Sequence, residues 1–227
     1  MGANTHFDLE EVTVRQANQA LQDAEAGSFS IANPKGAHAL ACGLDSPLDV
    51  TIDGHVGYYC AGMNKEADVR VDGNAGTGLA ENMMSGRVHV TGNASQSAAA
   101  TAHGGLLVID GDASARCGIS LKGADIVVKG NVGHMSAFMA QTGTLVVLGN
   151  AGDALGDSIY EARLYVRGEV ASLGADCIEK DMGPEHHEQL RALLDAAGCE
   201  GVETSAFRRY GSARKLYNFN VDNVDAY

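Results

Sequence analysis

The sequence predicts an all-β solenoid, a parallel β-helix with a single strand in each of about seven coils. The main observation is a short motif that returns every 19 residues with no insertion or deletion. A fixed period this short is typical of a solenoid, in which each copy needs the next to bury its apolar face. The motif is centred on seven glycines: Gly54, Gly73, Gly92, Gly111, Gly130, Gly149 and Gly168.

Two aliphatic columns precede these glycines and supply the second observation. Four residues before each glycine stand Val50, Val69, Val88, Leu107, Ile126, Leu145 and Leu164, and two before stand Ile52, Val71, Val90, Ile109, Val128, Val147 and Val166. This period of two predicts a strand with one buried face in each coil. In the fourth to sixth copies the residue between the columns is also apolar, so we expect the outer face to be covered there, at Val108, Val127 and Val146.

A polar column follows the glycines: His55, Asn74, Asn93, Asp112, Asn131, Asn150 and Glu169. Asparagine tolerates turn conformations and can bond along a ladder of stacked copies, so we interpret this column as structural and the glycines as turns. A row of ligand-binding side chains remains the alternative. Phosphate binding is disfavoured because phosphate loops place their glycines before a helix, whereas here each glycine lies between strands.

The chain divides into three expected regions. Residues 1–47 form a cap with a helix over 13–25 that starts at Thr13, a short strand at 29–31 and a turn at 33–36. Residues 48–176 form the β-helix. Residues 177–227 hold a second helix over 184–197, which begins with proline and ends before glycine, and a tail. The apolar stripe of that helix consists of Leu190, Leu193, Leu194 and Ala197.

Composition limits the partners of the chain. A formal charge of −13 over 227 residues disfavours nucleic acid and anionic membranes, and no apolar run is long enough to span a bilayer. The first residues do not resemble a secretory signal, and the five cysteines contain no C-x-x-C pair. We therefore expect a cytoplasmic protein with inert thiols.

No catalytic, cofactor-binding or metal-binding residues are predicted. The histidines of the array occupy four different positions in the repeat, so stacking does not bring them together: His55, His89, His103 and His134. Nucleophile-elbow, paired-carboxylate and H-E-x-x-H patterns do not occur. The basic and aromatic tail suits an interface, and its expected docking residues are Phe207, Arg208, Arg209, Tyr210, Tyr217 and Phe219.

The repeat carries a family resemblance. Four of its turns have the pattern G-x-x-G: Gly54 to Gly57, Gly73 to Gly76, Gly130 to Gly133 and Gly149 to Gly152. Together with the 19-residue stacking, these turns resemble the GXGXG domain, which is the C-terminal β-helix of the glutamate synthase large subunit. The chain is most similar to the small GXGXG subunit of N-methylglutamate synthase. Similar chains also occur in formylmethanofuran dehydrogenase, as one of its subunits.

The resemblance implies a right-handed β-helix that acts as a structural subunit of a hetero-oligomer. It would hold a class II glutamine amidotransferase subunit and a flavin-binding synthase subunit together, in a complex that forms N-methylglutamate from methylamine and glutamate. FMN, with or without an iron–sulfur cluster, is expected in the synthase subunit and no cofactor in this chain. Two alternatives remain: a scaffold of a formylmethanofuran dehydrogenase-type complex, and a solitary enzyme acting on an extended ligand along the rod.

Overall fold

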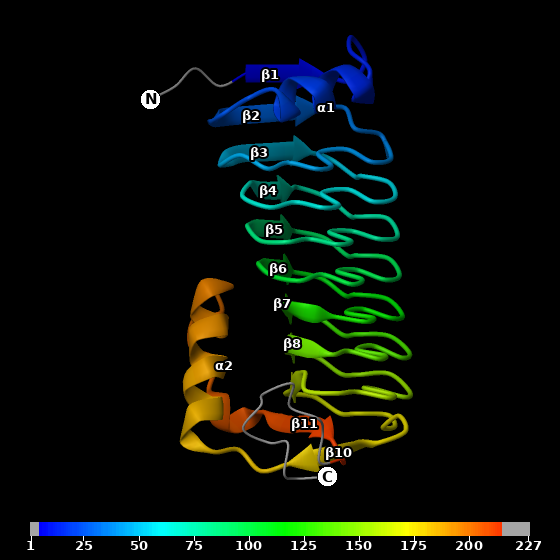
Figure 1. Ribbon diagram of the computed structural model, residues 1–227, viewed down its shortest axis with the longest axis vertical. Coiled ribbons are helices and arrows are strands. Elements are labelled where there is room, and N and C mark those ends of the chain that lie inside the picture. The colour runs from blue at the N-terminus through cyan, green and yellow to red at the C-terminus, as the bar shows by residue number, and fades with distance from the viewer. Residues whose placement is uncertain (1–4, 215–227) are drawn as a thin grey trace, which may run out of the picture.

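The computed structural model describes residues 5–214, which form a rod of stacked coils (Figure 1). One sheet runs along the rod, with the strand order β1-β2-β3-β4-β5-β6-β7-β8-β9-β11-β10. Its parallel strands are β1 (Thr5–Asp8), β2 (Gly27–Ala32), β3 (Leu48–Asp53), β4 (Asp68–Val71), β5 (Arg87–Val90), β6 (Leu106–Ile109), β7 (Lys122–Val128), β8 (Thr142–Val147) and β9 (Arg163–Val166). This architecture confirms the predicted all-β solenoid.

The strands of the sheet pair with the same 19-residue offset that separates the repeats in the sequence. From β3 to β9 each core residue pairs with the residue 19 positions later, as Val50 does with Val69 and Val69 with Val88. A second column of single bridges, beginning with Val56 and Ala75, links the same coils beyond the glycines. Both aliphatic columns are buried in one continuous core, which confirms the inward face that the alternation predicted.

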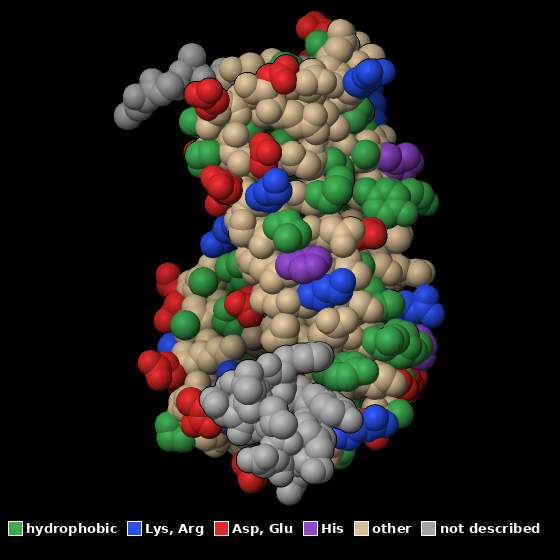
Figure 2. All heavy atoms as spheres, in the orientation of Figure 1, with side chains coloured by type: hydrophobic (Ala, Val, Ile, Leu, Met, Phe, Trp, Pro, Cys, Tyr) green, Lys and Arg blue, Asp and Glu red, His purple; other side chains and the backbone are tan. Residues whose placement is uncertain are grey.

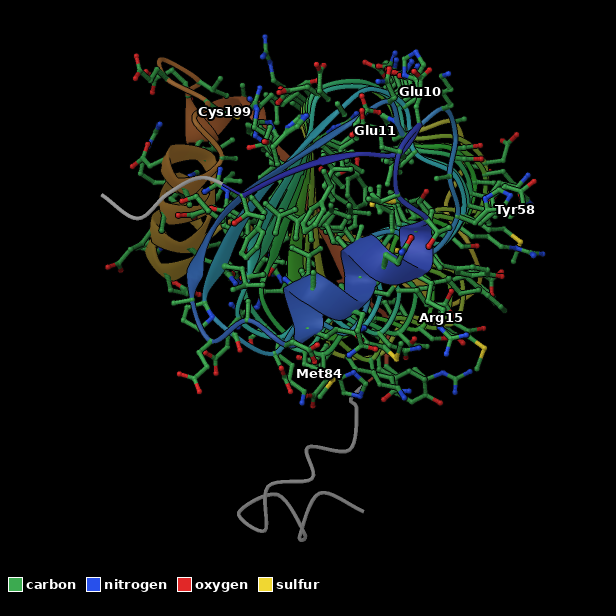
Figure 3. All side chains as sticks on the ribbon, turned by 90° about the horizontal axis from the view of Figure 1, so that it is seen from above. Glu10, Glu11, Arg15, Tyr58, Met84 and Cys199 are labelled. Carbon is green, nitrogen blue, oxygen red and sulfur yellow. The ribbon has the colours of Figure 1, made fainter. Side chains whose placement is uncertain are left out.

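The N-terminal segment closes one end of the core. Helix α1 (Val14–Gln22) begins where expected, because the Thr13 hydroxyl accepts a 3.2 Å bond from the Gln16 amide and the Gln16 side chain accepts a 2.9 Å bond from the Thr13 amide. The helix lies across the end of the stack and buries Leu21 against it (Figures 1 and 3). The expected strand at 29–31 is β2, whereas β1 was not predicted. The parallel sheet therefore extends across the expected boundary between residues 47 and 48.

The other end of the rod is built differently. After β10 (Cys177–Lys180) come α2 (Pro184–Ala196) and a short 3-10 turn at Thr204–Ala206. The chain then returns as β11 (Arg208–Ser212), which inserts antiparallel between β9 and β10. Helix α2 agrees with the sequence prediction, whereas the returning strand β11 was not predicted. β11 has no parallel copy in the repeat, so the 19-residue pattern carried no signal for it.

Small residues seven positions after the glycines mark a backbone constraint. Ala61, Ala80, Ala99 and Ala137 adopt φ values between 53° and 58° and are fully buried. A left-handed conformation is unfavourable for larger or β-branched side chains, and this corner also leaves little space. At Gly156 in the same column, an added Cβ would lie 2.8 Å from the Cys177 Sγ.

The central glycines allow neighbouring coils to approach each other. The Gly149 amide donates a 2.9 Å bond to the Gly130 carbonyl, and an added Cβ at Gly149 would lie 2.6 Å from both that oxygen and the Asn131 Oδ1. Among the seven, only Gly54 has a left-handed φ, of 131°. Close approach, rather than a special turn conformation, therefore explains why glycine stands at the other six positions.

The polar column forms the ladder that the sequence indicated. Each side chain accepts a bond from the backbone amide of the next coil, as Asn131 Oδ1 does from Asn150 at 2.8 Å. The same bond joins every neighbouring pair from His55 to Glu169, at 2.7 to 2.9 Å. These bonds satisfy backbone donors at the corner of each coil, where strand pairing has ended.

Replacing Gly149 by alanine should force two coils apart. We expect Gly149→Ala to lower the free energy of unfolding by about 2 kcal/mol, within the range for overpacked interiors, as measured by urea denaturation. Gly211→Ala is the matched control, because its added methyl would meet atoms no nearer than 3.8 Å. Equal stability of the two variants would contradict the close-approach explanation.

Candidate functional site

Helix α2 covers the outer face of the sheet over β6 to β9, on the side of the rod shown in Figure 1. Val108, Val127 and Val146 are fully buried there beneath Leu190 and Leu194. The aliphatic residues between the two core columns had predicted such a cover. The C-terminal helix is therefore part of the folded rod, and this portion of the sheet is not a free surface.

Two of the expected docking residues are buried within the folded chain. Phe207 is 4% exposed and packs in the cluster beneath α2, and Tyr210 is 2% exposed in the main core. The expectation that these rings are exposed is therefore wrong. The physical reason is β11, because its pairing with β9 carries the tail residues back to the sheet, where Phe207 is buried beneath α2 and Tyr210 is buried in the core.

The two arginines of the same strand bond to their own chain. Arg208 Nη2 donates to the Gly168 carbonyl at 3.1 Å and lies 3.8 Å from the Glu169 carboxylate. Arg209 Nε donates to the Asp181 carbonyl at 2.8 Å. These bonds hold β11 at the end of the rod, while a docking role for the arginines stays a prediction. Tyr217 and Phe219, the remaining expected docking residues, lie outside the described residues.

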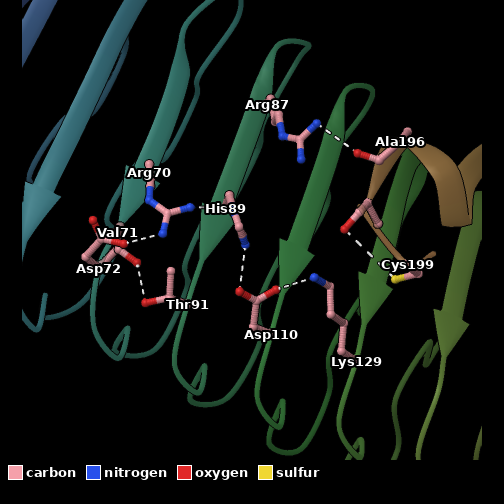
Figure 4. Close-up of polar contacts among 11 residues, drawn as sticks. Arg70, Val71, Asp72, Arg87, His89, Thr91, Asp110, Lys129, Ala196 and Cys199 are labelled. Carbon is pink, nitrogen blue, oxygen red and sulfur yellow. Dashed lines mark hydrogen bonds and ion pairs between the residues drawn. The ribbon is translucent and has the colours of Figure 1, made fainter.

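A charged chain of side chains crosses the outer face beside α2 (Figure 4). Arg70 lies 2.6 Å from Asp72 and 3.1 Å from His89 Nδ1, and His89 Nε2 lies 2.9 Å from Asp110. Lys129 Nζ completes the chain at 2.8 Å from Asp110. Arginine can only donate, so the bond from Arg70 makes Nδ1 an acceptor and places the imidazole proton on Nε2, facing Asp110.

The electrostatics of this charged chain are those of a structural clamp. Burial raises the pKa of Asp110, but its bonds to Lys129 and His89 outweigh burial and hold that pKa below the usual value. Arg70 and Asp72 pair within one coil, whereas His89 and Lys129 contact Asp110 from the coils on either side of it, and the clamp spans β4 to the residue after β7. At the edge of the clamp, Arg87 donates a 2.9 Å bond to the Ala196 carbonyl and joins the sheet to the end of α2.

A polar hollow of about 590 Å³ lies between the start of α2 and the sheet. Gln189 extends from the helix, accepts bonds from Arg163 at 2.7 Å and Tyr165 at 3.1 Å, and donates to Thr144 at 3.1 Å. Asp125 lines the same hollow, and burial raises its pKa. The polar groups mainly bond helix to sheet, and this lining contains no thiol or histidine that could serve as a nucleophile or base.

The thiols of the described residues have structural environments. All five cysteines are free, and burial raises the pKa of each, to about 12 for Cys117 and about 11 for Cys177. Such thiols are poor nucleophiles because little thiolate forms near neutral pH. Between residues 5 and 214, no three His, Cys, Asp or Glu side chains gather in a group that could hold a metal ion. No helix in the same range is long and apolar enough to cross a membrane.

The Asp110 clamp predicts a pH-dependent stability. Because the folded-state pKa of Asp110 is lowered, its contribution is present above the ordinary carboxyl pKa of 3.8 and is lost as pH falls through the folded value. We expect Asp110→Asn to cost about 1 to 2 kcal/mol at pH 7 and to lose less stability than the wild type between pH 6 and pH 3. Urea unfolding measured across this range tests the prediction.

The control for this experiment is Asp49→Asn, because Asp49 is exposed and forms no ion pair within the described residues. Its unfolding free energy should follow that of the wild type at every pH. A pH dependence in Asp110→Asn identical to that of the wild type would contradict the proposed clamp.

Comparison with known proteins places the chain in a family. No family model matches it. It is 61% identical over 225 residues to Protein GlxC from Rhizobium meliloti (strain 1021), a match that covers 97% of this chain and 99% of that protein. Identity at this level over nearly the whole of both chains includes the repeat array and both flanking regions. The chain therefore belongs to the same family as Protein GlxC.

Proposed function

We propose that the chain is a non-catalytic structural subunit of a glutamate synthase-like complex. The observation that carries the proposal is the uninterrupted 19-residue solenoid with G-x-x-G turns, which resembles the GXGXG domain of glutamate synthases. The match to Protein GlxC spans nearly all of that protein and favours a free-standing subunit over a domain of a large synthase chain. Within this class, N-methylglutamate synthase is the complex that we propose.

The rod is physically suited to hold two larger subunits at a fixed separation. Consecutive coils are joined by strand pairing, by the bridges beyond the glycines and by the side-chain ladder, so bending would break bonds at several corners at once. Fixed separation matters when a product of one active site must reach another without loss to solvent. In the proposed complex, the two active sites belong to a glutamine amidotransferase subunit and an FMN-containing synthase subunit.

The chemistry of the described residues supports an architectural role. The thiols are free but have raised pKa values, and the charged chain around His89 and Asp110 pairs its groups with one another. The polar hollow under α2 bonds the helix to the sheet through Gln189. These bonds join neighbouring coils and attach the helix to the sheet, and so stabilise the rod.

Exposed apolar side chains support the presence of partner proteins. Tyr58, Tyr59 and Met63 belong to one coil and are each about half exposed, and the rings of Tyr58 and His38 stack at 4.5 Å. Seen from the end of the rod, Tyr58 points outward from the coils (Figure 3). Apolar side chains also gather along one side of the rod in the space-filling view (Figure 2). Clustered exposed apolar groups commonly mark protein interfaces.

Purification of the tagged chain from its native host tests the proposal. We expect a glutamine amidotransferase subunit and a flavoprotein to co-purify in constant ratio, with flavin absorbance absent from the chain once it is separated. Molybdenum- or tungsten-containing partners would instead indicate a formylmethanofuran dehydrogenase-type complex. A stable solitary chain with enzymatic activity of its own would overturn the structural role.

The Tyr58 coil provides a variant for the same experiment. Tyr58→Ser combined with Met63→Ser should reduce recovery of at least one partner about tenfold or more, since exposed aromatic and methionine side chains often dominate interface energy. Met84→Ser is the matched control, because Met84 is comparably exposed but projects from another side of the rod (Figure 3). Circular dichroism should show that both variants keep the fold. Unchanged recovery with the double variant would exclude this coil as a docking surface.

A further inference from the structure

The polar hollow between α2 and the sheet lies at an irregularity in the strand pairing. From Asp125 onward β7 pairs with β8 at the usual offset of 19 residues, but Lys122 pairs with Thr142, an offset of 20. This is the one register shift among the described parallel strands. Bulges of this kind redirect nearby side chains and are common beside functional sites. Gly123 and Gly143, which flank the shift, form part of the wall of the hollow.

Opposite charges line this hollow without pairing with each other. Asp125 and Glu161 are its carboxylates, and Arg163 is its one basic side chain among the described residues. Neither carboxylate forms an ion pair within the described part of the chain. Arg163 bonds to the neutral side chains of Gln189 and Tyr165. Both signs of charge therefore face the same hollow without a partner of opposite sign.

A chain of hydrogen bonds holds Arg163 and Asp125 in place. Gln189 Oε1 accepts a 2.7 Å bond from Arg163 Nη1, and Gln189 Nε2 donates a 3.1 Å bond to Thr144 Oγ1. Thr144 is 1% exposed, and its hydroxyl bonds in turn to the Asp125 carboxylate. Burial raises the pKa of Asp125, as expected for a carboxylate with no cation beside it. The two charged groups are therefore preorganised by their own neighbours.

The separation of Asp125 and Arg163 suits a small zwitterion. Asp125 pairs with Thr144, and Thr144 pairs with Arg163, so the two charged residues occupy the same position two coils apart. At a strand spacing of about 4.8 Å, their Cα atoms lie about 10 Å apart. An α-amino acid carries its ammonium and its carboxylate on one carbon, and with a hydrogen bond of about 2.8 Å at each end it spans roughly 9 Å. A simple amine or a simple carboxylate would satisfy only one of the two groups.

We propose that this hollow binds a free α-amino acid, whose ammonium contacts Asp125 and whose carboxylate contacts Arg163. The ammonium supplies the cation that Asp125 lacks. A guanidinium group has five N–H donors, so Arg163 can bind the carboxylate while it keeps its bond to Gln189. Glu161 repels acidic side chains of the ligand, so neutral amino acids bind in preference to acidic ones. This site is separate from the docking surface proposed at Tyr58 and requires no partner subunit.

NMR titration of the purified full chain, labelled with ¹⁵N, tests the proposal with L-alanine as the probe. Ethylamine and propionate are the matched controls, because the first lacks the carboxylate of L-alanine and the second lacks its ammonium. We expect each control to bind about tenfold more weakly or less, since each loses one charge-assisted hydrogen bond. The Gly143 amide resonance should shift with L-alanine, whereas that of Gly211, outside the hollow, should not.

Two outcomes of this titration would overturn the proposal. Ethylamine that binds as tightly as L-alanine would show a simple cation site. The other is an unchanged spectrum at concentrations of L-alanine in the tens of millimolar.

Asp125→Asn removes the carboxylate while it preserves the size of the side chain. We expect this variant to bind L-alanine about tenfold more weakly or less, because the ammonium loses a charge-assisted bond. Asp49→Asn is the matched control, since Asp49 occupies the same position of the repeat in β3 but does not line the hollow. Circular dichroism should show that both variants keep the fold. Undiminished binding by Asp125→Asn would place the ligand elsewhere and would overturn the proposal.

The role of Glu161 is tested by the choice between two amino acids. The wild type should bind L-alanine about fivefold more tightly than L-aspartate, because of repulsion between like charges. Glu161→Gln should reduce this preference, while its affinity for L-alanine remains similar. A wild type that prefers L-aspartate would overturn the proposed charge selection. The same preference in Glu161→Gln as in the wild type would contradict the role assigned to Glu161.

Discussion

The close approach of consecutive coils at the central glycines is the constraint on which the structure depends. The five amide-to-carbonyl bonds that link the glycines from Gly73 to Gly168 measure 2.9 to 3.0 Å, and there is no space for a side chain between the layers. At this spacing the side chain after each glycine can reach the amide of the next coil. An insertion in any coil would shift both bonds out of register, which explains why the period stays at 19 residues throughout the array.

This constraint also determines which surfaces remain for function. Stacking uses the backbone groups at the corners and both aliphatic columns, while α2 covers the outer face of the later coils. Beside α2, the charged chain from Arg70 to Lys129 pairs its groups across the coils of β4 to β7. What remains for contact with other proteins is apolar surface on the remaining sides of the coils, including Tyr58 and Met63. A stiff rod with exposed apolar patches that can contact other proteins is consistent with a structural subunit.

The expected docking residues illustrate how composition can mislead. A basic and aromatic stretch in an acidic chain indicates an interface when the segment is exposed, but Phe207 and Tyr210 are buried by the chain itself. Two arginines separate the rings, so Phe207 and Tyr210 face opposite sides of the sheet, where Phe207 packs beneath α2 and Tyr210 packs in the main core. The stretch has too few residues to show from its pattern alone whether its partner strand belongs to the same chain.

The sequence by itself determined the repeat, the core columns, the asparagine ladder and the cover over Val108, Val127 and Val146, because each follows from residues that recur at one spacing. Both helices were also predictable, since Thr13 and Pro184 mark where they begin. Only the tertiary structure decided the pairing of β1, the insertion of β11 and the clamp around Asp110. These features join segments that occur once or that meet across coils through particular side-chain lengths, so a periodic pattern contains no information about them. Phe207 is buried because the chain returns to the sheet as β11, and the local sequence does not specify this return.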